Sequence, residues 1–366
     1  MLKKLYIEPT TKCNLNCKMC FRNTWFDEPI CDMSYEDYEH IINTMPSTVE
    51  KIFFGGMGEP MFHKDIYKMI SLASRKAEEV ELITNGTLLS DENIEKLLDS
   101  GLTKLWISID NLDTEDITSP GHENSDSVMR GIRAFNRIRQ IKMTGTGLGI
   151  TFVATKSNVH QLAKLPFFIA QFLIDEVNIS NIQPTDKASQ DEMLYKNMVN
   201  MYTGPAKGNV LPVVRIPYMD LSIDEAAVGM RELMIKQNFE LLYNDQPVMR
   251  KTAYCKFVRE GMCFVRSDGN VSPCMALLHN GYTYLNDIKR TIYYKSFGNI
   301  KDYPLSVIWN SDEYASFRKK FHDFDFSPCI YCGHCDLFSD NKEDCIGNNH
   351  PTCGGCLWAE GVLSCP

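Results

Sequence analysis

The chain opens with a short apolar segment that runs directly into three closely spaced cysteines, KLYIEPTTKCNLNCKMC (Lys4–Cys20). The first residues have the apolar character of a buried β-strand, so Cys13, Cys17 and Cys20 fall on the loop that follows it. In a parallel sheet this loop lies at the carboxyl end of the strands, where α/β proteins place their active sites. Three thiolates can hold three irons of a 4Fe–4S cube and leave the fourth iron open to another ligand.

The first half of the chain alternates strand-like and helix-like segments. Short apolar runs begin near residues 4, 51, 80, 105, 147 and 177, and they read KLYIEP, KIFFGG, VELITNG, LWISID, GLGITFVAT and VNISNIQP. Amphipathic stretches separate them, such as SDENIEKLLDSG, which has a helix N-cap signal at Ser90 and a stop at Gly101. This order predicts an α/β fold, a partial (β/α)6 TIM-like barrel with six parallel strands.

Length and composition indicate a globular chain of about two domains, with 366 residues, 44% hydrophobic and 23% charged. No apolar run approaches the ~18 residues that a membrane-spanning helix needs. The basic N-terminus lacks the apolar segment of a signal peptide, so we expect a cytoplasmic protein without a membrane partner. The net charge of −9, with no cluster of Lys and Arg, argues against a nucleic acid as the main partner.

The fourteen cysteines are placed unevenly, with four before residue 32 and ten from Cys255 onward. Disulfides are rare in a reducing compartment, so clustered thiols there indicate metal binding or catalysis. We predict a barrel core over residues 1–185, a bridging region over 186–250 and a cysteine-rich domain over 251–366. In the bridging region LPVVRIPYMDL is expected to be extended and EAAVGMRELMIKQNFELLY helical. For the first three cysteines, zinc completed by Cys31 or His40, or plain buried thiols, remain alternatives.

The spacing of Cys13, Cys17 and Cys20 resembles the CxxxCxφC signature of the radical S-adenosylmethionine (radical SAM) superfamily, with Met19 at the usually aromatic position. In that family the amino and carboxylate groups of S-adenosylmethionine chelate the open iron. GGMGEP (Gly55–Pro60) follows the second strand and resembles the glycine-rich turn of the family, with one extra Met–Gly pair. Glycines let the backbone approach a ligand closely.

The resemblance implies further contacts with S-adenosylmethionine at the ends of the strands. The family role of Glu59 is mainly to organise the glycine turn. The TNG and SID segments end the third and fourth strands, and weaker candidates end the fifth and sixth. The implied cofactor-binding residues are Gly55, Gly56, Gly58, Glu59, Thr84, Asn85, Ser108, Asp110, Thr155 and Gln183.

The C-terminal cysteines resemble those of the SPASM domain, which binds two auxiliary 4Fe–4S clusters. The resemblance implies one cluster on Cys255, Cys263, Cys274 and Cys356, and another drawn from Cys329, Cys332, Cys335, Cys353 and Cys365. Two of the ten thiols would be spare, with Cys345 the first choice. The segment CIYCGHC carries one cysteine more than the usual pattern, and a zinc ribbon built from CIYCGHC and PTCGGC is the alternative.

The resemblance implies an enzyme that cleaves S-adenosylmethionine reductively and uses a 5′-deoxyadenosyl radical to remove hydrogen from a peptide or protein. An electron donor such as ferredoxin or flavodoxin is expected. With only twelve residues before Cys13 we expect no leader-recognition domain, which favours a folded protein or its exposed segment as the target. A separate recognition protein is the alternative. The ending DCIGNNHPTCGGCLWAEGVLSCP most resembles maturases of tungsten-cofactor oxidoreductases. The alternatives are a ribosomal peptide crosslinking enzyme, an anaerobic sulfatase-maturing enzyme and, from another class, a non-enzymatic metal-binding module.

Overall fold

The computed structural model describes residues 1–112, 125–195, 255–285, 287–327, 335–359 and 361–366. It also describes short pieces at 213–216, 224–225, 228–229, 240–243, 246–247 and 329. Cys332 and most of the predicted bridging region therefore lie outside the described residues. The domain limits at 185 and 250 stay predictions.

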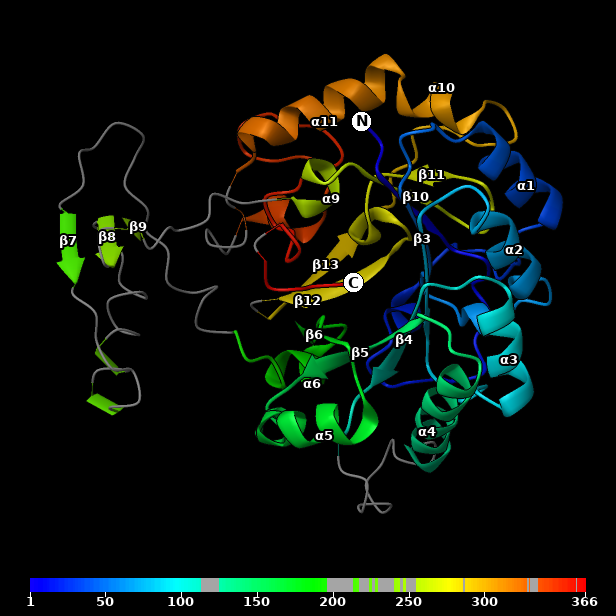
Figure 1. Ribbon diagram of the computed structural model, residues 1–366. Helices are drawn as coiled ribbons and strands as arrows, with labels where there is room; N and C mark the ends of the chain where they lie inside the picture. Colours follow the sequence, from blue (N-terminus) through cyan, green and yellow to red (C-terminus); the bar gives the residue numbers. More distant parts are fainter. Residues whose placement is uncertain are drawn as a thin grey trace.

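Six parallel strands in sequence order form the larger part of one sheet, from β1 to the edge strand β6 (Figure 1). They are β1 (Lys4–Ile7), β2 (Lys51–Phe54), β3 (Glu79–Thr84), β4 (Lys104–Ile109), β5 (Gly147–Ala154) and β6 (Glu176–Asn181). The six-stranded parallel barrel fragment predicted from the sequence is confirmed. The carboxyl ends of all six strands therefore meet at one edge of the sheet, which is where the loop with the first cysteines begins.

Two strands from the C-terminal part of the chain extend this sheet beyond β1. β10 (Met262–Val265) pairs in parallel with β1, with Leu5 opposite Cys263, and β11 (Val271–Ser272) pairs with β10 in the antiparallel sense. The sequence did not predict either strand. The cysteine-rich region is thus built onto the barrel sheet itself.

The helices of the core lie between the strands in sequence, and Figure 1 shows α1 to α4 in a row along the outer side of the sheet. Ser34 caps α1 by accepting from the N–H of Asp37, and Ser90 caps α3 by accepting from that of Asn93. Gly101 ends the α3 segment with a φ of +88°, so the N-cap and stop read from the sequence are confirmed. The bounds are α1 (Tyr35–Thr44), α2 (Ile66–Ala73), α3 (Asp91–Asp99), α4 (Ser125–Ile141), α5 (Leu165–Phe172) and α6 (Lys187–Asp191), with 3-10 turns η1 (Phe21–Thr24), η2 (Pro60–Phe62) and η3 (Val159–Lys164).

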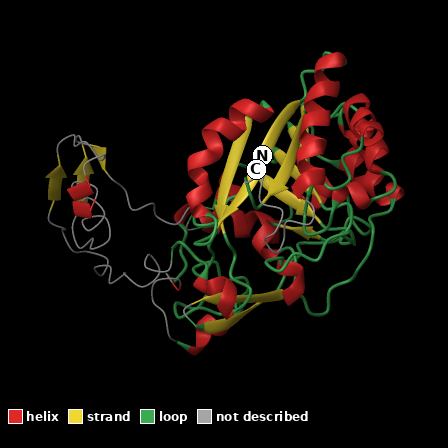
Figure 2. Cartoon of the chain, turned by 90° about the horizontal axis from the view of Figure 1, so that it is seen from below, coloured by secondary structure: helices red, strands yellow, loops and turns green. Residues whose placement is uncertain are grey.

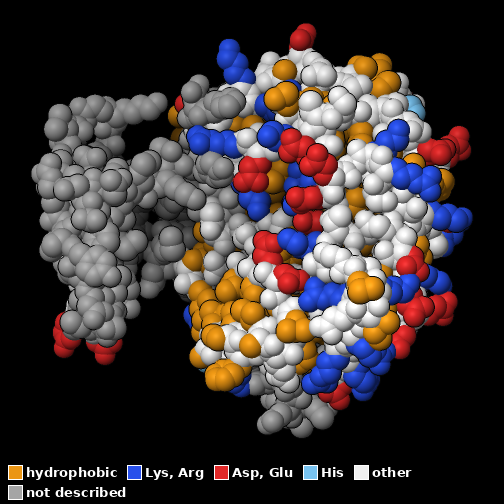
Figure 3. Space-filling view, viewed as in Figure 1, with side chains coloured by type: hydrophobic (Ala, Val, Ile, Leu, Met, Phe, Trp, Pro, Cys, Tyr) orange, Lys and Arg blue, Asp and Glu red, His pale blue; other side chains and the backbone are white. Residues whose placement is uncertain are grey.

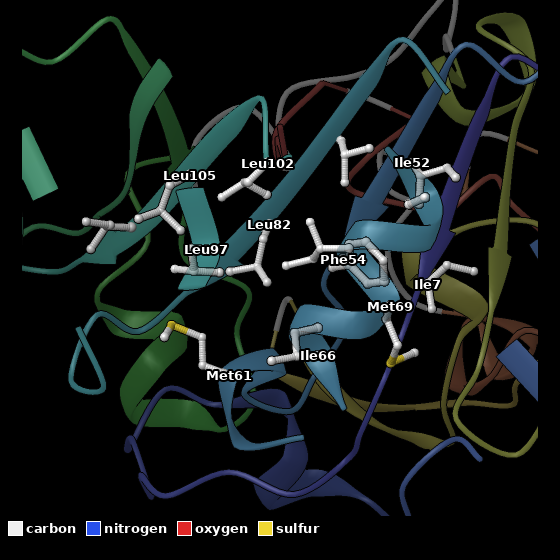
Figure 4. Packing of buried hydrophobic residues seen from close by; sticks show 14 of the residues in the cluster. Ile7, Ile52, Phe54, Met61, Ile66, Met69, Leu82, Leu97, Leu102 and Leu105 are labelled. Atoms are coloured by element: carbon white, nitrogen blue, oxygen red, sulfur yellow. The ribbon is translucent and has the colours of Figure 1, made fainter. Parts of the chain in front are cut away.

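The strands bury both faces, and successive residues enter different cores. Leu5 and Ile7 belong to the core under the helices, whereas Tyr6 faces the inside of the barrel. The close view in Figure 4 shows Ile7 with Ile52 and Phe54 in that outer core. Each fully buried side chain of this size contributes about 1.5–3 kcal/mol. The inner core also takes in C-terminal residues, among them Cys255, Cys274, Cys353, Phe257 and Phe321.

The C-terminal part covers the inner side of the sheet, and Figure 2 shows its two-stranded hairpin set apart from the main strands. Gln190 of α6 is fully buried and holds the hairpin, because it donates to Asp287 Oδ1 at 2.9 Å and accepts from the Asp287 N–H at 2.8 Å. The elements are α9 (Lys256–Arg259), η4 (Met275–Leu277), β12 (Gly281–Leu285), β13 (Ile288–Ile292), α10 (Leu305–Trp309), α11 (Asp312–Asp323) and η5 (Asp336–Ser339).

The last residues run back along β6 and reach β1. Ser364 donates to Asn178 Oδ1 at 2.8 Å, Asn181 donates to the carbonyl of Val362 at 2.8 Å, and Lys4 donates to the carbonyl of Pro366 at 3.0 Å. The tail thus links β6, at one edge of the sheet, to β1, which lies further inside the sheet.

A separate three-stranded sheet comprises β7 (Val213–Ile216), β8 (Glu240–Tyr243) and β9 (Gln246–Pro247). β7 falls in the segment predicted to be extended, but β8 corrects the prediction of a helix at its end. The residues ELLY suit a strand because Leu and Tyr also fit a pleated surface. None of the described helices is long and apolar enough to cross a bilayer. Acidic and basic side chains are interspersed over the face seen in Figure 3.

Candidate active site and cysteine groups

The loop after β1 brings the first three cysteines together. The N–H of Cys20 donates to the carbonyl of Cys17 at 3.0 Å, and the N–H of Leu15 donates to Sγ of Cys13 at 3.4 Å. Burial raises the pKa of Cys17, and Asp110, Cys20 and Cys13 raise it further. The three thiols and the Asp110 carboxylate therefore lie within electrostatic range of one another. Cys17 is exposed, so the group is open to solvent on that side.

The glycine turn after β2 packs directly against the backbone that leads into Cys13. A Cβ on Gly58 would lie 2.1 Å from the carbonyl oxygen of Thr10 and 2.7 Å from that of Lys12. The next residue fixes this approach, because the N–H of Glu59 donates to the Lys12 carbonyl at 2.8 Å. Gly56 has a φ of +120° and lies against the side chain of Glu8. The turn therefore sets the position of the cysteine loop.

The Glu59 carboxylate joins the glycine turn to the end of β3. It is 2% exposed and accepts from the N–H of Met61 at 3.0 Å, the hydroxyl of Thr84 at 2.8 Å and the N–H of Asn85 at 2.7 Å. Burial raises the pKa of Glu59, although these hydrogen bonds oppose the shift. Both carboxylate oxygens of Glu59 accept hydrogen bonds from the protein, and Glu59 therefore holds the loops around the site in place.

Asn85 carries this connection to the cysteines. Its Nδ2 lies 3.9 Å from Sγ of Cys13 and donates to Oδ1 of Asn14 at 3.0 Å. Asn14 in turn donates to the hydroxyl of Thr87 at 2.9 Å. Asn14 and Thr87 were missed from the sequence, where only their position beside Cys13 and Asn85 could have pointed to them.

The remaining residues predicted to bind the cofactor lie near the ends of β4, β5 and β6, in different surroundings. Ser108 is half-buried near the end of β4, and Asp110 follows it beside Cys17. Thr155 is buried and bonded locally, since its hydroxyl accepts from the Asn158 N–H at 3.3 Å. Gln183 lies against the C-terminal cysteines, because it lines a cavity with Cys274 and Cys353. Roles for these residues in binding S-adenosylmethionine stay predictions.

A buried charge network joins the loops around the first cysteines to the C-terminal region. Nδ1 of His279 lies 2.7 Å from Oε2 of Glu28, and its Nε2 lies 2.8 Å from Oε1 of Glu8. Arg266 donates to Oε2 of Glu28 at 2.8 Å, and Glu8 also accepts the Met57 N–H of the glycine turn at 3.0 Å. Since carboxylates only accept, both ring nitrogens of His279 donate when the ring is protonated. No motif predicted this network.

The network should make stability depend on pH. Burial alone would lower the pKa of His279, but Glu8 and Glu28 outweigh it and hold the pKa above its ordinary value, against the smaller effect of Arg266. A raised folded pKa means that this stabilisation is complete below the unfolded value of about 6.5 and is lost as pH rises through the folded pKa.

We expect His279→Gln to lose this dependence. Relative to the variant, the wild type should lose up to about 1.4 kcal/mol of unfolding free energy per pH unit, the limit for one proton. Thermal unfolding between about pH 5 and pH 9 checks this, with the exposed His40→Gln as control. Equal pH slopes in the wild type and His279→Gln would contradict the assignment.

Four C-terminal cysteines line one apolar cavity together with Phe257, Phe317 and Phe321; they are Cys255, Cys274, Cys353 and Cys356. Burial raises the pKa of Cys255 to about 12 and also raises the pKa values of Cys274 and Cys353, which the neighbouring thiols push further upward. Such thiols lose their protons when a metal takes the proton's place. Within the described part of the chain, no three ligand side chains converge closely enough for a single ion. The four thiols line one shared cavity, which makes them candidate ligands of a single group.

A second group comprises Cys329, Cys335 and Cys345. Burial raises the pKa of Cys329 to about 11, with Arg290 opposing and Asp344, Cys345 and Cys335 adding to the shift. Sγ of Cys345 lies 3.0 Å from the Ser327 hydroxyl oxygen. Three thiols are thus gathered in the described residues, close in sequence to Cys332.

Two cysteines stand apart from both groups. Cys263 is fully buried beside Tyr314 and Arg318, and Cys365 lies beside Lys256, Lys4 and Tyr6. The structure does not bring Cys263 together with Cys255, Cys274 and Cys356, as the sequence reasoning expected. The reason is that β10 joins the sheet, so that Cys263 points under the helices while Phe264 faces the inner core.

Sequence models of two families match the chain. That of the radical SAM superfamily matches residues 7–162, and that of the SPASM iron–sulfur cluster-binding domain matches residues 255–336.

Some of the curated relatives align over nearly the whole chain. The "tungsten-containing aldehyde ferredoxin oxidoreductase cofactor-modifying protein" of Pyrococcus furiosus is 28% identical over 372 residues, covering 100% of this chain and 97% of the relative. An "AdoMet-dependent heme synthase" of Nitratidesulfovibrio vulgaris is 23% identical over 362 residues, covering 95% and 85%. Among solved structures, SuiB of Streptococcus suis bound to S-adenosylmethionine superposes with a TM-score of 0.57 at 18% identity, covering 93% of this chain and 72% of SuiB.

Proposed function

The chain belongs to the radical SAM superfamily and carries an SPASM domain, and from this premise we propose that it matures a tungsten-dependent oxidoreductase by modifying its cofactor. The observation that carries the proposal is the match to the cofactor-modifying protein, which spans both chains almost completely. That span includes the extended CIYCGHC segment and the cysteines that follow it. The heme synthase relative also bears the name of an enzyme that acts on a cofactor.

The cofactors of this enzyme are 4Fe–4S clusters and S-adenosylmethionine. When bound and reduced, they supply a 5′-deoxyadenosyl radical that removes hydrogen from a substrate. Cys13, Cys17 and Cys20 would hold the first cluster. The turn Gly55–Glu59 fixes the loop of these cysteines, and Asn85 presents an amide beside Cys13. An electron donor such as ferredoxin or flavodoxin is part of the proposal.

For the auxiliary clusters we infer two ligand sets. The first is Cys255, Cys274, Cys353 and Cys356, supported by their shared cavity. The second is Cys329, Cys335 and Cys345 with Cys332, supported by the electrostatic proximity of the first three. Two cubes need about eight cysteines, so Cys263 and Cys365 are the two spare thiols. Cys353 thereby replaces Cys263, and Cys345 is a ligand.

The two ligand sets predict different iron contents for two single variants. Cys353→Ala should lose most of one cluster, about four irons per chain, because the apolar side chains that line this cavity offer no donor to replace the missing thiolate. Cys263→Ala should keep its iron, because its thiol faces the core under the helices. Iron and sulfide analysis of anaerobically reconstituted protein checks this. Iron loss in Cys263→Ala with none in Cys353→Ala would contradict the first set.

The test of function supplies a tungsten-containing aldehyde ferredoxin oxidoreductase, made without a maturase, to the reduced enzyme with S-adenosylmethionine. We expect the oxidoreductase to stimulate 5′-deoxyadenosine formation and its extracted cofactor to change in mass. The control is the enzyme with Cys13, Cys17 and Cys20 replaced by alanine. Stimulation with a mass change in the polypeptide alone would favour the peptide-modifying alternative, and no stimulation would contradict the proposal.

A further inference from the structure

Arg290 of β13 is a deeply buried cation in the C-terminal region. It is 4% exposed, and its guanidinium donates to the carbonyl of Gly355 at 2.7 Å and to that of Asp340 at 3.3 and 3.4 Å. Among the described residues no carboxylate forms an ion pair with it. Arg266 shows the contrast, because that equally buried guanidinium is paired with Glu28 at 2.8 Å. A buried charge without a paired carboxylate is costly unless another anion compensates it.

The surroundings of Arg290 indicate which anion this is. Arg290 lines a cavity of about 60 Å³ together with Cys274, Cys353 and Cys356. The guanidinium also lies tightly over the loop between two of these cysteines, since a Cβ on Gly355 would be 2.2 Å from its Nη1.

The second cysteine group lies within electrostatic range of the same guanidinium. Burial lowers the pKa of Arg290, whereas Cys329, Cys356, Cys353 and Asp340 raise it. The guanidinium thus stands between thiols of both groups. With its charge retained, it is a fixed cation facing two sites of developing negative charge.

A 4Fe–4S cube with four thiolates carries net negative charge, and reduction adds one more electron. A fixed positive charge in a low-dielectric interior favours the more negative, reduced form. We propose that Arg290 raises the reduction potentials of the auxiliary clusters, most strongly that of the cluster on Cys255, Cys274, Cys353 and Cys356. This inference rests on the ligand sets proposed above. Arg290 is a tuning residue, which acts through the cluster without touching the substrate.

The test compares Arg290→Gln, which removes the charge, with Arg290→Lys, which keeps it. Lys289→Gln is the matched control, because it removes a positive charge from the neighbouring, exposed position of the same strand. Each full-length protein is reconstituted, its iron is counted, and its clusters are titrated with dithionite while electron paramagnetic resonance records the reduced fraction. Repeating the titration with Cys13, Cys17 and Cys20 replaced by alanine isolates the auxiliary signals.

In Arg290→Gln with full iron, we expect the reduced-to-oxidised ratio of an auxiliary cluster at fixed potential to fall at least tenfold, or 59 mV for one electron. The ratio should fall less in Arg290→Lys, and in Lys289→Gln it should equal that of the wild type. Unchanged ratios in Arg290→Gln would overturn the inference. Loss of auxiliary iron in both Arg290 variants would also overturn it, because Arg290 would then be needed to assemble the site. A wild type without auxiliary iron would instead contradict the proposed ligand sets.

Discussion

Replacing Cys13, Cys17 and Cys20 together by alanine should lower the iron content of the reconstituted protein from ~12 to ~8 atoms per chain, because three cubes become two. The structure gathers these thiols on one loop, separate from both C-terminal groups. The remaining irons should therefore be unaffected. Iron, sulfide and zinc analysis of anaerobically reconstituted protein measures the change.

The control for this variant is Cys31→Ala. Cys31 also belongs to the N-terminal cysteines, but its Sγ lies 3.3 Å from the hydroxyl oxygen of Ser267. The Cys31→Ala variant should retain the full iron content. A wild type with only about four irons and with zinc in the C-terminal region would still be consistent with a radical enzyme, but it would contradict the auxiliary clusters. Zinc without any iron in the wild type would contradict the enzyme altogether.

The single substitution Gly58→Ala should both destabilise the protein and cause loss of the cluster held by Cys13, Cys17 and Cys20. The new Cβ would meet two backbone carbonyls, of Thr10 at 2.1 Å and of Lys12 at 2.7 Å, and no side chain can swing aside to make room. Overpacking of this kind costs about 1–3 kcal/mol, and we expect the upper end, about 3 kcal/mol. Because the displaced backbone leads into Cys13, about four irons should be lost as well.

The matched control is Gly145→Ala, since a Cβ there has no heavy atom within 4 Å. Thermal unfolding and iron content of the two variants are compared side by side. We expect Gly145→Ala to have the melting temperature and the iron content of the wild type. A Gly58→Ala protein with wild-type iron and the same melting temperature as the control would show that the turn does not fix the cysteine loop.

The barrel could be predicted because its strands are buried on both faces. Such strands read as nearly continuous apolar runs, and all four residues of β1 are buried. The loop cysteines and the glycine turn then followed from their positions after β1 and β2. These features are local in sequence, so that spacing alone locates them.

What the sequence could not predict depends on contacts between distant segments. MCFV of β10 is apolar and buried, but its pairing with β1 joins segments that lie far apart in the sequence. That pairing decides which way Cys263 points, and hence which thiols share a cavity. The network of Glu8, Glu28 and His279 is of the same kind, because its members lie up to 271 positions apart.

As a radical SAM enzyme, this chain is expected to cleave S-adenosylmethionine by one-electron reduction. The most direct measurement is the formation of 5′-deoxyadenosine by anaerobically reconstituted, dithionite-reduced protein, quantified by mass spectrometry. We expect 5′-deoxyadenosine and methionine from the wild type, and neither above background from the protein with Cys13, Cys17 and Cys20 replaced by alanine. A fully iron-loaded and reduced wild type that binds S-adenosylmethionine but forms no 5′-deoxyadenosine, with or without the oxidoreductase, would contradict it.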